Sequence, residues 1–154
     1  MAIRKIVTVG DPVLNKKSRT VEKFDARLHA LLDDMKDTLV KSDGVGLAAV
    51  QVGVLKRVVI VDVGDGLIEL INPEITYTED EQEGEEGCLS VPGKSGIVKR
   101  PMTVKVRAQN RDGKWCLYSG TELKARCFCH EIDHLDGILY TSHVTKWVVH
   151  KDEK

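Results

Sequence analysis

The sequence predicts an α+β fold in which antiparallel or mixed β-sheets pack around a central His-Glu-x-x-His helix. An amphipathic helix is expected closer to the N-terminus. Three observations predict this fold: leucines recur at helical spacing after Asp25, β-branched stretches flank glycine-containing turns, and His130 and His134 lie four residues apart.

The 154 residues are expected to form one domain, 1–154, since this length supports a hydrophobic core and no repeat or linker divides it. The formal net charge is −1 and no basic stripe is apparent, so the composition carries no direct nucleic-acid signal. No apolar run is long enough to span a membrane, and no secretory signal opens the chain. These features favour a cytoplasmic protein with reduced cysteines.

The first helix is predicted to begin after Asp25, which is a favourable N-cap residue. Its apolar residues recur every three or four positions, at Leu28, Leu31, Leu32, Met35 and Leu39. This spacing places them on one face, so we expect a helix that packs on the core and carries no chemistry.

A stretch of small residues follows this helix and reads Gly44-Val45-Gly46-Leu47-Ala48-Ala49-Val50-Gln51. Small residues let the backbone come close to another group. A dinucleotide-binding turn is excluded, because the third glycine is missing and a helix precedes the stretch. Two interpretations remain, a tightly packed loop or an edge that lines a cleft, where Gln51 would offer an amide donor.

Two β-hairpins are predicted from the pattern of β-branched residues and turns. The first joins 57–63 to 67–71, and the second joins 103–108 to 114–118. The acidic run at 79–86 lies between them and is expected to form a solvated loop.

The predicted central helix carries a metal-binding pattern. Residues four apart on a helix share one face, so His130 and His134 can bind the same metal ion, with Glu131 beside a bound water. Thr121 or Ser119 is expected to cap the start of the helix, and Gly137 to end it. The alternative is an ordinary amphipathic helix whose histidines bind nothing. The opposite face should pack on the core through Ala125, Phe128, Ile132 and Leu135.

A catalytic metal site normally has a third protein ligand and one open position. Cys127 lies on the histidine face, but seven residues correspond to about 10 Å along the axis, too far to share a metal with His134. The third histidine of the metzincin pattern would fall on Tyr140. Neither position supplies the ligand.

Two cysteines and two histidines remain as candidate third ligands. Cys116 alternates within a predicted strand and is expected in the core, and His143 and His150 are weaker candidates. Cys88 is expected in a loop or at a strand edge, where a bound metal would stabilise its thiolate. Local context therefore favours Cys88, although spacing alone does not decide it.

Three stretches together resemble the motifs of the peptide deformylase family: residues 44–51, Glu86-Gly87-Cys88-Leu89-Ser90 and His130-Glu131-Ile132-Asp133-His134. They occur in the order and at the spacing typical of the family, and the likeness extends from Gly10 to Leu139. The chain departs from the family at Cys129, where glutamine is usual, and at Val13, where arginine is common.

The resemblance implies a hydrolase that removes the N-terminal formyl group from formylmethionine of newly made polypeptides and releases formate. It implies that the ligands of a divalent metal are Cys88, His130 and His134. A metal-activated hydroxide would attack the formyl carbon, with Glu131 as general base and then general acid. The Gln51 amide and the Leu89 backbone N–H would stabilise the oxyanion.

The resemblance also implies how the substrate and metal are held. Gly46 would hydrogen-bond to an extended peptide, and Val45, Leu123 and Cys127 would line the methionine pocket. Iron(II) is the implied metal, with zinc, nickel or cobalt possible in preparations. The implied partners are formylmethionyl nascent peptides, met at the ribosome, while the oligomeric state stays open. A zinc endopeptidase and a catalytically silent metal-binding protein are the competing hypotheses.

Overall fold

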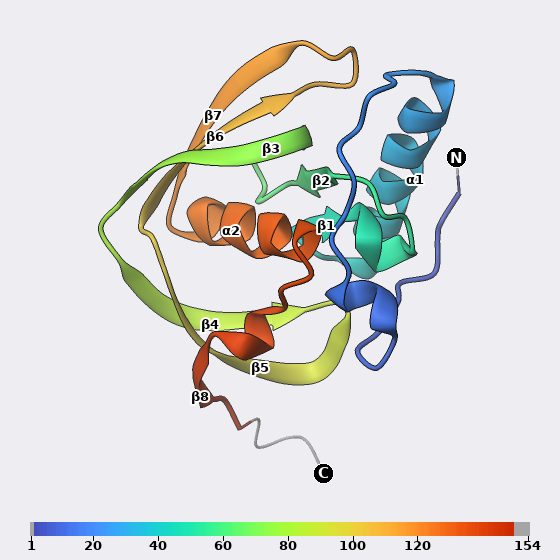
Figure 1. Ribbon diagram of the computed structural model, residues 1–154. Helices are drawn as coiled ribbons and strands as arrows, with labels where there is room; N and C mark the ends of the chain where they lie inside the picture. The colour runs from blue at the N-terminus through green and yellow to red at the C-terminus, as the bar shows by residue number, and fades with distance from the viewer. Residues whose placement is uncertain (1, 150–154) are drawn as a thin grey trace.

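Helix α2 (Leu123–Leu135) lies between two antiparallel sheets in the computed structural model, which describes residues 2–149 (Figure 1). One sheet has the strand order β1-β2-β3-β6-β7, and the other has the order β4-β5-β8. The α+β class is therefore confirmed, with antiparallel pairing in both sheets. The expected domain 1–154 also includes positions outside the described residues.

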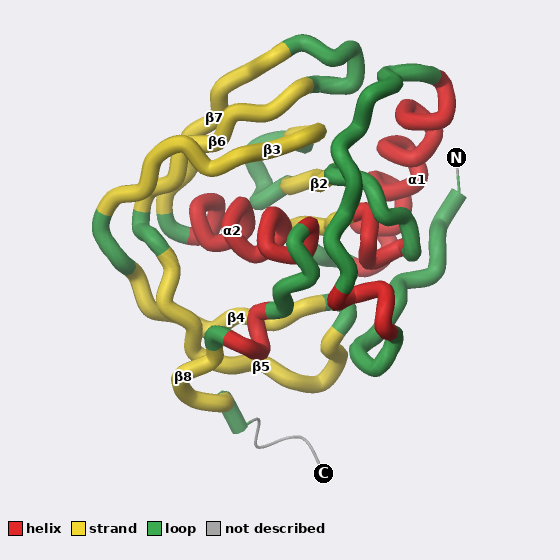
Figure 2. Tube along the Cα trace, in the orientation of Figure 1, coloured by secondary structure: helices red, strands yellow, loops and turns green. Residues whose placement is uncertain are grey.

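The strands account for most of the chain between the two helices (Figure 2). The larger sheet contains β1 (Gly46–Ala48), β2 (Val58–Val61), β3 (Ile68–Glu79), β6 (Thr103–Gln109) and β7 (Trp115–Thr121). The smaller sheet contains β4 (Gln82–Cys88), β5 (Val91–Arg100) and β8 (Val144–Trp147). Short 3-10 helices are η1 (Pro12–Asn15), η2 (Ala49–Val52) and η3 (Tyr140–Ser142). Both predicted hairpins are present, as β2–β3 and β6–β7.

Helix α1 (Ala26–Ser42) forms where the leucine spacing predicts it. The Asp25 side chain accepts a hydrogen bond from the backbone N–H of Leu28, which satisfies one of the free donors at the helix start. The predicted apolar face is buried against β2 and the first residues of β3. Neither α1 nor another helix within residues 2–149 combines the length and apolar character needed to cross a membrane.

The sequence predicted the end of α2 correctly but not the residue that caps its start. The helix begins after Glu122, which has φ +53° and makes no side-chain cap, whereas Thr121 and Ser119 belong to β7. The predicted N-cap was therefore wrong, because the β6–β7 pairing continues to Thr121. The predicted stop is confirmed, since Gly137 adopts φ +74° and a Cβ there would lie 2.5 Å from the Asn15 carbonyl oxygen.

One side of α2 packs on the larger sheet, as its apolar face predicts. Ala125, Phe128, Ile132 and Leu135 are buried in a cluster with valines of β2 and β6. Cys127 and Cys129 are buried in the same cluster. This contact holds the other side of the helix toward β4, where the histidines project.

The acidic run does not form the solvated loop that the sequence predicted. Residues 82–88 form β4, paired with β5 along its whole length. Glu83 and Glu85 are exposed, while Glu86 is buried. Successive residues of a strand point to opposite faces of the sheet, which can have different surroundings. The acidic run contains too few apolar residues for an alternating pattern to predict the strand.

Cys116 was expected in the core and is half-buried instead. It lies on β7, which is an edge strand of the larger sheet, and its neighbour Trp115 is 45% exposed. An edge strand has a neighbouring strand on one side only. A side chain on it is therefore less enclosed than one on a central strand.

Candidate metal centre

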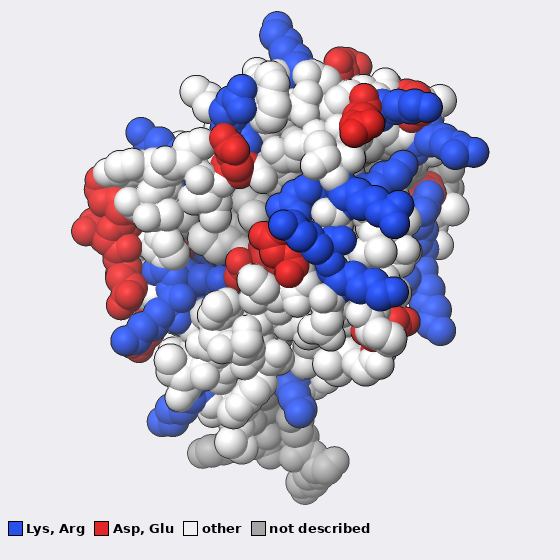
Figure 3. Space-filling view, in the orientation of Figure 1, with Lys and Arg blue, Asp and Glu red and all other residues white. Residues whose placement is uncertain are grey.

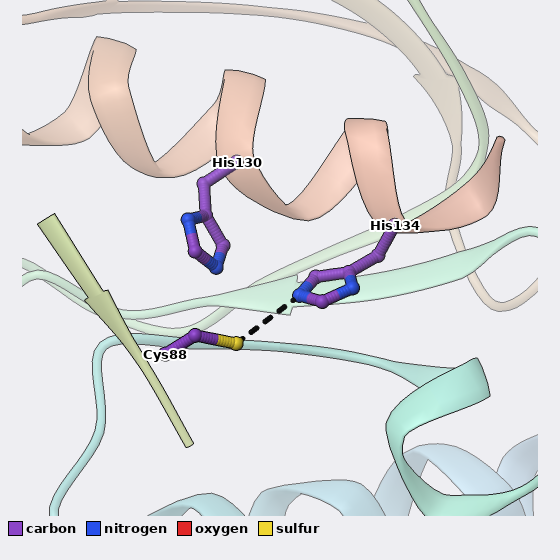
Figure 4. Close-up of side chains that lie close together, drawn as sticks. All are labelled: Cys88, His130 and His134. Carbon is purple, nitrogen blue, oxygen red and sulfur yellow. Dashed lines mark hydrogen bonds between the residues drawn. The ribbon is translucent and has the colours of Figure 1, made fainter. Parts of the chain in front are cut away.

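Two imidazoles and one thiol meet between α2 and the end of β4. The helical repeat brings His130 and His134 to the same side of α2, and the end of β4 carries Cys88 toward them (Figure 4). One ligand atom from each of the three lies within 4.8 Å of the others. The Cys88 Sγ is 3.4 Å from the His134 Nε2. This donor set and spacing suit one divalent metal ion.

The other candidate ligands lie apart from this cluster. Cys116 is on β7, and the His143 Nε2 lies 3.5 Å from the Asp133 Oδ2. Position 150, the remaining histidine considered from the sequence, is outside the described residues.

The surroundings of the cluster fit a bound cation. Burial alone would lower the pKa of His130, but the charge of Glu131 and the hydrogen bonds with Cys88 and Glu86 raise it to about 10. The same negative groups that favour a proton on this imidazole also favour a metal ion. Burial, and then the neighbouring His130, lower the pKa of His134 to about 3, which keeps that ring in the neutral form a metal requires.

Glu86 contacts His130 on the side of the ring that faces away from the cluster. Its Oε1 lies 2.6 Å from the His130 Nδ1, so the ring's other nitrogen is directed into the cluster. Arg100 donates to both oxygens of the same carboxylate at 2.7 and 3.1 Å, and Arg126 adds a third contact at 2.8 Å. Burial would raise the pKa of Glu86, but the hydrogen bonds from His130 and Arg100 lower it to about 2. Sequence reasoning missed this role, although the position of Glu86 two residues before Cys88 was a usable signal.

Glu131 is buried beside the cluster and is 4% exposed. Its Oε2 lies 4.0 Å from the His130 Nε2, and its Oε1 has no hydrogen-bond partner among the described residues. Burial raises its pKa to about 7. A carboxyl group with such a pKa can both accept and donate a proton near neutral pH.

Gln51 presents an amide to the cluster from η2. The backbone N–H of Ala48 donates to its Oε1 at 2.9 Å, which fixes the orientation of the amide. Its Nε2 then points toward the Ser90 Oγ at 3.1 Å and the Cys88 Sγ at 3.6 Å. The small-residue stretch is thus both an edge strand and the wall of a cleft.

Two connected hollows open beside these groups. A cavity of about 330 Å³ is lined by Gly46, Gln51, Cys88, Leu89, His130 and Glu131, among others. A smaller one of about 120 Å³ is lined by Val45, Leu123 and Cys127 and by charged or titratable residues, namely Glu85, Glu86, Arg126, His130 and Glu131. The structure therefore brings every predicted site residue to one place. A Cβ on Gly46 would lie 2.7 Å from the Glu131 Oε2. The absence of a side chain at Gly46 therefore leaves room for the Glu131 carboxylate beside the cluster.

Comparison with known proteins identifies the family that shares this arrangement. A family model described as polypeptide deformylase matches residues 3–149. The chain belongs to the polypeptide deformylase family. Deformylases remove N-terminal formyl groups from nascent polypeptides and depend on a metal, so the enzyme function expected from the motifs is confirmed at the level of the family.

Individual deformylases match over nearly the whole chain. A peptide deformylase of Alkaliphilus metalliredigens is 61% identical over 146 residues, covering 95% of this chain and 99% of the relative. One from Caldanaerobacter subterraneus is 53% identical over 148 residues, covering 96% and 93%. The crystal structure of the Thermotoga maritima deformylase superposes with a TM-score of 0.92 at 39% identity, covering 94% of this chain and 99% of that one. The Legionella pneumophila enzyme gives a TM-score of 0.91 at 44% identity, covering 94% and 87%.

Proposed function

We propose that residues 1–154 form a single catalytic domain, a cytoplasmic, iron(II)-dependent deformylase that acts on formylmethionyl nascent peptides at the ribosome. The observation that carries this proposal is the meeting of Cys88, His130 and His134 within 4.8 Å, with the buried Glu131 at their side. The HExxH helix α2 is then the metal-binding helix, and the amphipathic helix α1 supports the cleft wall at its C-terminal end.

The metal ligands are Cys88, His130 and His134. When bound, a divalent metal lowers the pKa of water and polarises the formyl oxygen. One thiolate with two imidazoles suits iron(II), zinc, nickel or cobalt, and the family resemblance favours iron. Glu86 keeps the His130 ring oriented through its 2.6 Å hydrogen bond.

Glu131 moves the proton of the reaction. Its carboxylate, whose Oε1 has no hydrogen-bond partner among residues 2–149, accepts a proton from the attacking water as the new bond to the formyl carbon forms. The same carboxyl group then donates this proton to the amide nitrogen as the carbon–nitrogen bond breaks. The products are formate and a free amino terminus, so atoms and charge balance. The pKa of about 7 suits a group that must do both.

Two donors stabilise the negative charge that develops on the formyl oxygen. The Gln51 Nε2 is one, because the Ala48 backbone already fixes its orientation. The Leu89 backbone N–H is the other, since Leu89 lines the same cavity directly after Cys88. A donor of this kind typically contributes about 10²–10³ in rate.

The substrate extends from this centre along the edge strand. The backbone of Gly46 hydrogen-bonds to the peptide in the manner of an added strand. The methionine side chain enters the 120 Å³ hollow lined by Val45, Leu123 and Cys127. Val45, Leu123 and the Cys127 thiol form the part of its lining that suits an unbranched thioether chain.

The deciding experiment measures formate released from formyl-Met-Ala-Ser by protein purified without oxygen and analysed for its metal. A Glu131→Ala variant serves as the comparison, and cleavage of an unformylated internal peptide tests the endopeptidase hypothesis. We expect formate from the wild type, a loss of at least about 10³-fold in the variant, and no internal cleavage. A metal-loaded protein that releases no formate would refute the proposal.

A further inference from the structure

Six exposed cationic side chains gather on one face of the molecule. This basic face consists of Lys16, Lys17, Arg19, Lys23, Arg27 and Lys56. In Figure 3 the Lys and Arg side chains collect over the segment that leads from η1 to α1 in Figure 1. Four of the six line an open hollow of about 740 Å³, so the face is concave at its centre.

The fold assembles this face from separate parts of the chain. The backbone N–H of Arg19 donates to the Leu55 carbonyl at 3.0 Å, and that of Arg57 donates to the Arg19 carbonyl at 2.9 Å. This short parallel bridge places Lys56 alongside the 16–23 segment. Arg27 joins from the first turn of α1. Five of the six cations lie between residues 16 and 27 of the sequence, and the fold adds Lys56 to them. The hollow that they surround exists only in the folded chain.

Ion pairs do not neutralise the basic face within the part of the chain that the structure describes. None of the six cations forms an ion pair with a carboxylate among residues 2–149, whereas Arg4, Arg111 and Lys124 elsewhere do. Three acidic residues border the face. Asp25 caps α1 and also interacts with Lys56, while Asp136 pairs with Arg57. Asp25 and the exposed Glu22 line the hollow beside its four cations. The cations therefore outnumber the available anions.

The opposite edge of the molecule is acidic. Exposed acidic side chains follow the end of β3 and the outer face of β4, at Glu79, Asp80, Glu81, Glu83 and Glu85. Figure 3 shows acidic side chains along the left edge, away from the basic face, with some Lys and Arg side chains beside them. A net charge of −1 thus conceals an uneven distribution of charge, and a local excess of positive charge attracts a polyanion.

We propose that the basic face binds the sugar-phosphate backbone of RNA. Lysines and arginines from several elements around an open hollow suit a chain of phosphates, which needs charge and no particular base. The preference for RNA over an acidic protein rests on the proposed function, because a nascent polypeptide is still attached to the ribosome, whose surface is largely RNA. Binding there would raise the local concentration of formylated substrate without changing the catalytic site.

The test measures binding of the full-length protein to a labelled RNA duplex of about 20 base pairs by fluorescence anisotropy, between about 50 and 200 mM salt. One variant carries Lys16→Gln, Lys17→Gln, Lys23→Gln and Lys56→Gln. The control variant has the same net charge through Lys99→Gln, Lys105→Gln, Lys114→Gln and Lys146→Gln, which are exposed elsewhere. Poly-glutamate serves as a competitor, and formate release is measured separately on all three proteins.

We expect wild-type binding in the range of about 10⁻⁶–10⁻⁴ M, with the first variant at least about tenfold weaker and its salt slope smaller by about 3. The control should stay within about twofold of the wild type, and formate release should be unchanged in both. Equal losses in the two variants, or no wild-type binding at low salt, would overturn the proposal. Displacement of RNA by poly-glutamate at equal charge concentration would assign the face to an acidic protein instead. Absent formate release with intact RNA binding would refute the proposed function alone.

Discussion

The Glu86 Oε1 lies 2.6 Å from the His130 Nδ1, and the same carboxylate accepts hydrogen bonds from Arg100 and Arg126. A buried anion thus orients a metal ligand, while the hydrogen bonds from His130 and Arg100 keep that anion ionised. The carboxylate comes from β4 and the imidazole from α2, so this contact also links the smaller sheet to the central helix.

Replacing Glu86 by glutamine should loosen the metal. Glutamine keeps the shape but loses the charge, so His130 becomes a weaker and less fixed ligand, and we expect metal affinity about 10–100-fold lower. Metal content after dialysis against a chelator measures this directly. Arg100 and Arg126 lose their counter-charge as well, so unfolding should also become easier by a few kcal/mol.

Glu83→Gln is the matched control for this change, because Glu83 is an exposed residue of the same strand. It should retain metal and activity like the wild type. Equal metal retention by Glu86→Gln and Glu83→Gln would show that the 2.6 Å contact does not support the metal.

The ionisation of Glu86 should make the fold sensitive to acid. Its pKa lies near 2 in the folded chain, compared with 4.5 for an unperturbed glutamate. Between these values the unfolded chain binds a proton that the folded chain does not, so this stabilisation is complete above about pH 5 and is lost toward pH 2. Urea unfolding at about pH 6 and pH 3 should show a larger loss of unfolding free energy in the wild type than in Glu86→Gln. An identical loss in both would contradict the assignment.

Removing the Gln51 amide should slow the reaction more than it weakens substrate binding. The Nε2 group is held toward the cluster and would stabilise charge that exists only in the transition state. We expect Gln51→Ala to lower kcat by about 10²–10³ with little change in KM. Ser90→Ala removes one of the acceptors of this amide and should cost much less. A change confined to KM would argue for a role in binding alone.

A methyl group at Gly46 should displace the base. Its Cβ would lie 2.7 Å from the Glu131 Oε2 and 2.8 Å from the Cys127 Sγ, both closer than atoms can approach. Glu131 or the edge strand must move, and small misplacements of a reacting group cost about 10²-fold in rate. Formate release by Gly46→Ala tests this, with metal content measured alongside. Wild-type turnover would mean that the cleft can widen at no cost to catalysis.

Periodic and motif-like features were predictable from the sequence because they depend on near neighbours in the chain. The leucine spacing of α1 with its Asp25 cap, the two hairpins and the Gly137 stop are all present. The His130–His134 pair follows from helical geometry alone. The choice of Cys88 rested on local context and family resemblance, and the fold brings it within 4.8 Å of both rings.

The failures all concern positions whose surroundings come from distant segments. The 79–86 run became part of a strand because β5 pairs with β4, and Glu86 is buried because Arg100 and Arg126 reach it. Neither arginine lies near it in the sequence.

By itself, then, the sequence determined the elements with strong periodicity, the residues able to bind a metal, and the family. The tertiary structure alone decided the burial of Glu86, the partial exposure of Cys116, and the hollow where Lys56 joins the basic segment 16–27. The physical reason is the same in each case. Periodicity is a property of the backbone repeat, whereas burial and electrostatic environment depend on which distant segments pack together.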